Sequence, residues 1–427
     1  MNTLGRSFSV WRKVLLVGVG FLFLLAAAGC GGQAGKEGAG GKQEAGKAAA
    51  KPIKVGIIDC YTGAATTYTQ DALDGFKLAI EESSKQGGPK IEFVQRDDQF
   101  KVDVALNWAK ELVLREQVDL LAGSINSAAA LAVSNYAKEN KVPFFVWGAM
   151  SDKISGEAGH RYVFQMLPNT AMIGRAGAVQ MAKLPYTRYW LAGSDYEYGH
   201  AVVNNFWANL EKMKPGVQKA GESWWRVGES DFTPYINGIR SAKPKPEVLV
   251  VGTGGADMVP FLKAVKATGL SREMQVWVHT ATDLSTLRPL GAEAPEGLLG
   301  TNPYHYYYPD TPENKAFVEA FKKTYNREPA AFAIYGYLTG KFIAEGIKKA
   351  GSADREKLID ALEGLTINSP VGTVTIRQFD HQIMMPMFFG KTTKKEGLPY
   401  LVAGEITTLS ADQIIPPVEE IQKKRGK

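Results

Sequence analysis

The chain has 427 residues, two cysteines and a formal net charge of +6. Arg6, Arg12 and Lys13 lie in the first thirty residues, and residues 31–51 carry four lysines against two glutamates, so the rest of the chain has a formal charge of +1. This near-neutral balance argues against a nucleic-acid partner, which requires a basic face. The roughly 375 residues after position 51 exceed what one hydrophobic core usually holds, so we expect two lobes.

Residues 1–30 have the pattern of a secretory signal. A positively charged start is followed by an apolar run over residues 14–28, which is shorter than the ~20 residues of a membrane-spanning helix. Residues 25–30 (LAAAGC) resemble a bacterial lipobox, with Ala27 in place of the usual leucine. The resemblance implies that Cys30 is the acylated first residue of the mature protein; the alternative is that Cys30 merely ends a signal anchor.

Residues 31–51 consist mainly of Gly, Ala, Lys, Glu and Gln, which bury nothing and predict a flexible tether. We therefore expect a lipid-anchored, extracytoplasmic protein of the cell envelope. With Cys30 acylated, Cys60 has no cysteine partner, so a disulfide framework and a cysteine metal site are excluded, and no metal or cofactor is predicted. Cys60 itself is predicted to be a buried free thiol.

From residue 52 onward, short apolar runs alternate with amphipathic segments, which is typical of βαβ units around a parallel sheet. The first series has expected strands at 53–59, 91–96, 119–123 and 143–147, and expected helices at 70–84, 103–116 and 127–138.

A second series of the same kind begins near residue 172. Its expected strands are 188–192, 223–227, 247–251 and 275–279. Two of its helices are expected to end near residues 183 and 213, and two more to span 233–241 and 256–267. An aromatic loop at 302–309 then precedes helices at 313–325, 330–351 and 354–363 and β segments at 371–376 and 384–390. Two doubly wound α/β lobes place their strand-end loops across a cleft, which is the usual ligand position in such sheets.

Several motifs occur in order along the chain. They are YTGA at 61–64, DFTPY at 231–235, PDTPEN at 309–314, and SPVG at 369–372 ahead of DHQ at 380–382. Over residues 52–400 the sequence resembles the type I periplasmic solute-binding proteins of ABC transporters, in the leucine/isoleucine/valine-binding branch.

The resemblance implies a type I fold with three interlobe crossings, placed near 167–170, 300–302 and 366–370. Lobe 1 would then contain residues 52–168 and 302–366, lobe 2 would contain 171–300 and 370–410, and 411–427 would be a polar tail. Hinge closure around a small molecule, recognised by the membrane subunits of an ABC importer, is the implied action of a monomer.

The resemblance also implies ligand contacts on strand-end loops. Tyr68 takes the place of an aromatic residue that packs on the ligand, or else staples the following helix. Ser127, followed by Ala128, matches a serine that binds a ligand carboxylate at a helix N-terminus, although an ordinary N-cap suits serine equally well. In the third loop, Met150 replaces a threonine, and the backbone N–H groups of Gly148 and Met150 are left as candidate donors.

Tyr198 matches a tyrosine near the ligand's amino group. The carboxylate that would pair with an ammonium group falls in the family around residues 279–282, where no glutamate occurs, and Asp283 is the nearest candidate. The run of residues 304–308 is predicted to alternate between exposed and buried positions. It nevertheless lies where family members line the cleft, so Tyr306 and Tyr308 are candidates for stacking on a ligand ring.

The ligand implied by the family is a branched-chain or related amino acid; the alternative is an aromatic or short-chain carboxylate or an amide. An enzyme is not expected, since residues 252–255 (GTGG) lack the third glycine of a dinucleotide turn and no hydrolase, Walker or HExxH motif occurs. A ligand-sensing receptor domain shares this fold but would normally be fused to a further membrane span, and the chain ends at Lys427 after a polar segment.

Overall fold

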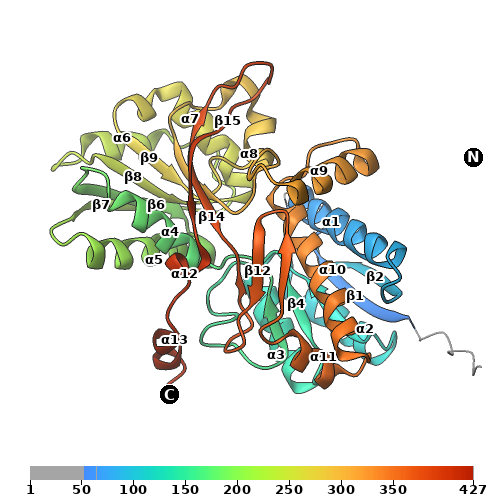
Figure 1. Cartoon of the computed structure of the whole chain (residues 1–427). Helices are drawn as coiled ribbons and strands as arrows, with labels where there is room; N and C mark the ends of the chain where they lie inside the picture. The colour runs from blue at the N-terminus through green and yellow to red at the C-terminus, as the bar shows by residue number, and fades with distance from the viewer. Residues whose placement is uncertain (1–51, 64, 427) are drawn as a thin grey trace, which may run out of the picture. The chain divides into compact units, whose positions relative to one another are not determined.

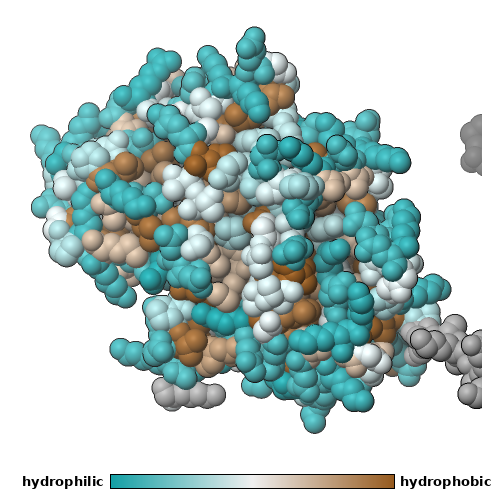
Figure 2. All heavy atoms as spheres, viewed as in Figure 1, coloured by the Kyte–Doolittle hydropathy of each residue, from teal (hydrophilic) through white to brown (hydrophobic). Residues whose placement is uncertain are grey.

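A computed structural model describes residues 52–63 and 65–426 (Figure 1). The predictions for the signal peptide, Cys30 and the tether lie outside these residues. Within the described residues, no helix is both long and apolar enough to cross a membrane. Hydrophilic side chains cover most of the face shown in Figure 2.

Lobe 1 is built on a five-stranded parallel sheet with the order β2-β1-β3-β4-β5. The strands are β1 (Ile53–Asp59), β2 (Ile91–Asp97), β3 (Leu120–Gly123), β4 (Phe144–Val146) and β5 (Val163–Gln165). The helices are α1 (Thr66–Lys85), α2 (Val102–Leu114), α3 (Ser127–Glu139), α9 (Pro312–Tyr325), α10 (Ala331–Ala350) and α11 (Arg355–Leu362). Val55 and Ile57 pack with α1, whereas Ile58 packs with α2 and α3, so helices cover both faces of the sheet.

Helices α1 and α10 lie in close contact, although they are far apart in the sequence. Each contributes a glycine at the contact: a Cβ atom on Gly75 would overlap the carbonyl of Ala333, and one on Gly336 would overlap the carbonyl of Ala72. The close approach brings Phe332, at the start of α10, next to Tyr68 in α1.

Lobe 2 is built on a seven-stranded sheet with the order β15-β14-β10-β9-β8-β6-β7. The strands are β6 (Arg188–Ser194), β7 (Gln218–Trp225), β8 (Val248–Gly252), β9 (Gln275–Val278), β10 (Leu299–Asn302), β14 (Met387–Thr393) and β15 (Val402–Leu409). The helices are α4 (Thr170–Met181), α5 (Glu197–Met213), α6 (Thr233–Ser241), α7 (Met258–Thr268) and α8 (Leu284–Leu290). Strands β6 to β10 pair in parallel, and β14 and β15 add an antiparallel edge.

The third crossing between the lobes lies later in the chain than expected. Strands β11 (Thr366–Ser369), β12 (Gly372–Ile376) and β13 (Ile383–Met384) form a small antiparallel sheet, and Gln382 bridges to Gln165 at the end of β5. Residues 370–384 were expected in lobe 2, but these contacts attach them to lobe 1. The chain therefore passes into lobe 2 between β13 and β14, after earlier crossings at 166–169 and after Asn302.

Gln382 also joins the first and third crossings. Its amide donates to the carbonyl of Leu167 at 2.7 Å and its side-chain oxygen accepts from Asn169 at 3.0 Å and from Ser155 at 2.9 Å. Because Gln382 is fully buried, these bonds hold two chain crossings together where the lobes meet.

Residues 411–426 are not a featureless polar tail. They form α12 (Ala411–Ile414), which packs on α4 of lobe 2, and α13 (Val418–Lys424), reached by the descending segment in Figure 1. The Arg425 guanidinium donates to the carbonyls of Gly156 at 2.7 Å and Ser155 at 2.8 Å, both in lobe 1. Residues 411–426 thus contact both lobes. The contact of Arg425 with lobe 1 joins residues about 270 positions apart in the sequence.

Candidate functional site

A cavity of about 350 Å³ lies between the two lobes, where the strand-end loops of both sheets meet. We refer to it as the interlobe cavity. Its lining from lobe 1 is Ala65, Tyr68, Phe100, Ile125, Asn126, Ser127, Ala128, Gly148, Met150 and Phe332, and from lobe 2 it is Tyr196, Glu197, Tyr198, Gly254, Gly255 and Thr280. Six predicted site residues therefore come together here: Tyr68, Ser127, Ala128, Gly148, Met150 and Tyr198.

Aromatic rings form much of the wall. Tyr68 packs against Phe332 with ring centres 4.9 Å apart, and Tyr196 lies beside Tyr198 at 5.9 Å. Burial raises the pKa of Tyr68 to about 12, and it raises the pKa of Tyr198 well above 10. These phenols are consequently neutral at physiological pH and keep a proton to donate.

Phe100 is a wall residue that the sequence reasoning missed. It has a φ of 62°, which is rare for a bulky side chain, and it is 46% exposed. Its amide donates to Asp98 Oδ1 at 2.8 Å, and its carbonyl accepts from Asn126 at 2.9 Å. These bonds fix the loop that presents the ring to the cavity. The feature of the sequence that could have identified Phe100 is its position as an isolated aromatic residue in the strand-end loop at 97–101.

The start of α3 is capped by Asn126 and not by Ser127. Asn126 Oδ1 accepts from the amides of Ala128 at 2.9 Å and Ala129 at 3.2 Å, and Ser127 is the first helical residue. The alternative reading of Ser127 as the N-cap is therefore wrong. Two of the N–H groups that an anion would use are already occupied, whereas the hydroxyl and amide of Ser127 have no partner among the described residues.

The loop after β4 contributes backbone to the cavity. The indole of Trp147 donates to Asp59 Oδ2 at 2.7 Å inside the core, so this side chain faces away from the cavity. Within the part of the chain that the structure describes, the amides of Gly148 and Met150 have no protein acceptor. A Cβ on Gly148 would lie 2.9 Å from the Cα of Ile125, so glycine permits the two loops to pack together.

Asp283 does not line the interlobe cavity. It caps α8 by accepting from the amide of Ser285 at 2.7 Å and from the Ser285 hydroxyl, and it is 2% exposed. The side chain of Asn302 and the amide of Ala331 also face the carboxylate, and burial raises its pKa. Asp283, the nearest candidate partner for a ligand ammonium group, therefore has its oxygens engaged by the protein and lies outside the cavity lining.

Tyr306 and Tyr308 also lie away from the interlobe cavity. The Tyr306 hydroxyl is 3.3 Å from that of Tyr400, and the Tyr308 hydroxyl is 2.8 Å from Oγ1 of Thr408. Between them, Tyr307 bonds to Ala403. The aromatic loop therefore packs on β15 and its preceding segment, and the expected stacking of Tyr306 or Tyr308 on a ligand is not supported.

Glu197, at the start of α5, is a further lining residue that the sequence reasoning missed. Its carboxylate is 3.0 Å from the ammonium group of Lys153 and accepts from the Ser151 hydroxyl at 3.2 Å. Glu197 belongs to lobe 2, whereas Lys153 and Ser151 belong to lobe 1. The one charged side chain in the described lining is therefore already paired across the lobes.

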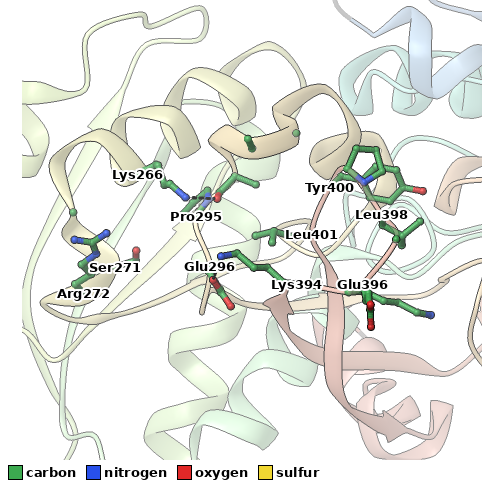
Figure 3. A pocket seen from close by; sticks show the side chains of 17 residues that line it. Lys266, Ser271, Arg272, Pro295, Glu296, Lys394, Glu396, Leu398, Tyr400 and Leu401 are labelled. Atoms are coloured by element: carbon green, nitrogen blue, oxygen red, sulfur yellow. Dashed lines mark hydrogen bonds and ion pairs between the residues drawn. The ribbon is translucent and has the colours of Figure 1, made fainter.

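A second hollow, of about 730 Å³, lies on lobe 2 between the end of α7 and the 394–401 loop. Lys266, Arg272, Glu296 and Lys394 are among its lining residues (Figure 3). This hollow lies near the amino-terminal ends of β9 and β10. Ligands of doubly wound sheets bind instead beyond the carboxyl ends of the strands. The interlobe cavity is therefore the better candidate ligand site.

Comparisons with known proteins agree with this fold. A model of the periplasmic binding protein family matches residues 52–397. The leucine-, isoleucine-, valine-, threonine- and alanine-binding protein of Pseudomonas aeruginosa is 26% identical over 333 residues, which are 76% of this chain and 86% of that protein.

Two solved structures from Rhodopseudomonas palustris are also similar. An ABC-type branched-chain amino acid transporter protein has a TM-score of 0.72 and 27% identity, covering 86% of this chain and 99% of that one. A solute-binding protein in complex with 3,4-dihydroxybenzoic acid has a TM-score of 0.74 and 25% identity, covering 84% and 98%. The chain therefore belongs to the periplasmic binding proteins of ABC transporters, with the type I fold that the resemblance predicted.

Proposed function

We propose that this protein captures a small carboxylate with an apolar, aromatic body outside the cytoplasm and delivers it to the membrane subunits of an ABC importer. The observation that carries the proposal is the interlobe cavity, whose wall includes five aromatic side chains and whose one charged side chain among the described residues, Glu197, is already paired with Lys153. Members of this family are solute-binding transport components, and we propose a binding role and no catalysis for this chain as well.

The argument against an α-amino acid concerns its ammonium group. A buried cation requires a paired anion. Two buried carboxylates of lobe 2 are engaged elsewhere: Asp283 with Ser285, and Asp257 with the Ser194 hydroxyl at 2.6 Å and the Gly228 amide at 2.7 Å. Neither lines the interlobe cavity. A ligand without an α-ammonium therefore fits the described charges better.

A ligand carboxylate would meet neutral donors. The cavity lining among the described residues contains no lysine, arginine or histidine. It does contain the Ser127 hydroxyl, the amides of Gly148 and Met150, and protonated tyrosine hydroxyls, and hydrogen bonds from such donors to an ionised carboxylate are stronger than neutral ones. A volume of about 350 Å³ suits a small ligand, such as a single-ring acid, and the aromatic wall favours ring packing.

A branched-chain amino acid is the second candidate. It is favoured by the position of Glu197, which lines the cavity and would accept an ammonium group if it exchanged Lys153 for the ligand. The branched-chain amino acids bound by the Pseudomonas relative point the same way, whereas the benzoate derivative in the Rhodopseudomonas complex supports the first candidate.

Thermal-shift and calorimetric titration of the chain from residue 52 onward would test the proposal, because a ligand that binds only the folded state raises its melting temperature. We expect benzoate, 4-hydroxybenzoate or 3,4-dihydroxybenzoate to stabilise the protein and leucine, isoleucine and valine to have no effect. Stabilisation by the amino acids alone would overturn the aromatic carboxylate and establish the second candidate.

We also propose that the protein is a monomer held at the outer face of a membrane by lipid on Cys30. The LAAAGC sequence and the following Gly- and Lys-rich segment support this anchor. Radiolabelled fatty acid should be incorporated into the wild-type protein, and Cys30→Ser should release it into the soluble fraction. Equal membrane retention of both forms would argue for an uncleaved signal anchor instead.

A further inference from the structure

Three potential metal ligands meet at the carboxyl ends of β1 and β2. Cys60 directly follows β1, Asp97 ends β2, and Asp98 follows it; the parallel register pairs Asp59 with Asp97, which brings the two strand ends together. The Cys60 sulfur and one carboxylate oxygen from each of Asp97 and Asp98 lie within 4.8 Å of one another. These residues take no part in the ligand contacts described above.

A second observation points to a missing ligand at this cluster. Asp98 is fully buried, and although its Oδ1 accepts from the Phe100 amide, its Oδ2 has no hydrogen-bond partner among the described residues. An unpaired buried oxygen is unfavourable, and more so when the group is charged. The carboxyl groups of Asp97 and Asp98 lie beside the Cys60 sulfur, and Asp59 Oδ1 accepts from the Cys60 amide at 3.0 Å, so three acidic side chains meet at this point.

We propose that Cys60, Asp97 and Asp98 bind a divalent transition-metal ion, with Zn²⁺ as the best fit. A thiolate favours Zn²⁺ over Mg²⁺ or Ca²⁺, and Zn²⁺ accepts carboxylate oxygens as well. Ligand distances of about 2.0–2.3 Å require the three atoms to close to roughly 3–4 Å from one another, a modest contraction of the observed cluster. Binding forms a Zn–S bond and releases the thiol proton of Cys60 to solvent.

Neighbouring groups already orient these ligands. Asp97 accepts from the amides of Tyr61 at 3.0 Å and Gln99 at 2.9 Å and from the Thr62 hydroxyl at 2.8 Å, which holds the carboxylate against the end of β1. The sequence reasoning excluded a cysteine metal site because one cysteine remained after lipidation. Two carboxylates, from the end of β2 and the residue after it, would complete the ligand set.

The site would act on the interlobe cavity through two loops. Cys60 begins the loop that leads to Ala65 and Tyr68, and Asp98 holds the amide of Phe100. Metal binding would therefore fix two parts of the lobe 1 wall in position. This is a stabilising role distinct from ligand capture.

The test uses chelator-treated protein from residue 52 onward, which contains both sheets and their cores, and needs no transported ligand. We expect one Zn²⁺ per chain by elemental analysis, a higher melting temperature with ZnCl₂ and no such rise with MgCl₂. Cys60→Ser and Asp98→Asn should each weaken Zn²⁺ binding at least tenfold, whereas Asp103→Asn, on the exposed start of α2, should not.

Circular dichroism of the metal-free variants will show whether they fold, and Cys60→Ser provides an independent measurement if Asp98→Asn does not. Failure of wild-type protein to bind stoichiometric Zn²⁺, or unchanged affinity in Cys60→Ser, would overturn the proposed site. Neither result bears on which molecule occupies the interlobe cavity, so the two proposals are tested separately.

Discussion

The carboxylate of Glu197 and the ammonium group of Lys153 lie 3.0 Å apart and belong to different lobes. Both side chains are more than a third exposed, so solvent and salt screen the pair and its contribution to stability is small. Its larger effect is on which ligand charge the cavity prefers. Glu197 lines the interlobe cavity, and Lys153 offsets its negative charge there. Opening of the lobes would separate the two residues.

Substitutions of this pair should distinguish the two ligand classes. Lys153→Gln leaves the Glu197 charge uncompensated, which repels a ligand carboxylate, whereas Glu197→Gln removes that charge. For an aromatic acid, we expect Lys153→Gln to weaken binding roughly fivefold or more and Glu197→Gln to change it less than threefold. Titration calorimetry at low salt measures both effects. The opposite order, with Glu197→Gln the more harmful substitution, would indicate an ammonium-bearing ligand.

Phe100→Ala tests the aromatic wall. Phe100 is 46% exposed in this structure and a ligand would bury part of that surface, so we expect a loss of about 1–2 kcal/mol, or roughly 5- to 30-fold in affinity. The melting temperature of the ligand-free protein should change little. Leu114→Ala is the matched control, because Leu114 is an exposed apolar residue of lobe 1 outside the cavity lining. Equal effects of the two substitutions on affinity would exclude a direct contact by Phe100.

The α1–α10 contact predicts opposite effects for two glycine substitutions. Gly336→Ala places a Cβ against the carbonyl of Ala72, so we expect destabilisation by about 1–3 kcal/mol and a lower melting temperature. Gly238→Ala, in α6, meets no atom within 4 Å and should stabilise the protein by about 0.5–1 kcal/mol by favouring the helix. Calorimetric melting of the two variants compares them directly. A neutral Gly336→Ala would show that the helices do not approach this closely.

The buried His305 predicts a loss of stability in acid. It stacks on Tyr307, its Nε2 has no partner among the described residues, and burial lowers its pKa from 6.5 to about 3. The folded protein therefore keeps His305 neutral, while the unfolded chain takes up a proton below pH 6.5. The contribution of neutral His305 to the free energy of unfolding is fully present above pH 6.5. It falls by up to about 1.4 kcal/mol per pH unit as the pH drops toward 3.

His305→Phe keeps a ring at this position and removes the titration. Relative to this variant, wild-type protein should lose stability between pH 7.5 and pH 5.0, measured by urea unfolding at each pH. Other titrating groups are common to both proteins, so their effects cancel in the difference. An identical stability gap at the two pH values would show that His305 is not held neutral by the fold.

Much of the candidate site could be predicted from local sequence patterns. Strand and helix periodicities predicted strand-end loops that meet across a cleft, and the family resemblance named Tyr68, Ser127, Gly148 and Met150 as ligand contacts, all of which line the interlobe cavity. Asp283 could not be placed in the same way. Its carboxylate turns back to cap α8 and to meet Asn302, a choice between internal and ligand partners that sequence spacing does not reveal.

The sequence by itself determined the two-lobed α/β fold, because hydrophobic periodicity and turn residues act locally along the chain, and its motifs in order carried the resemblance to the family. The tertiary structure decided the pairing of Glu197 with Lys153, the attachment of Gln382 to lobe 1 and the docking of Arg425 on the loop near Gly156. Each of these contacts joins residues far apart in the sequence. Such contacts depend on how the lobes pack and where side chains find hydrogen-bond partners, and no local pattern encodes that choice.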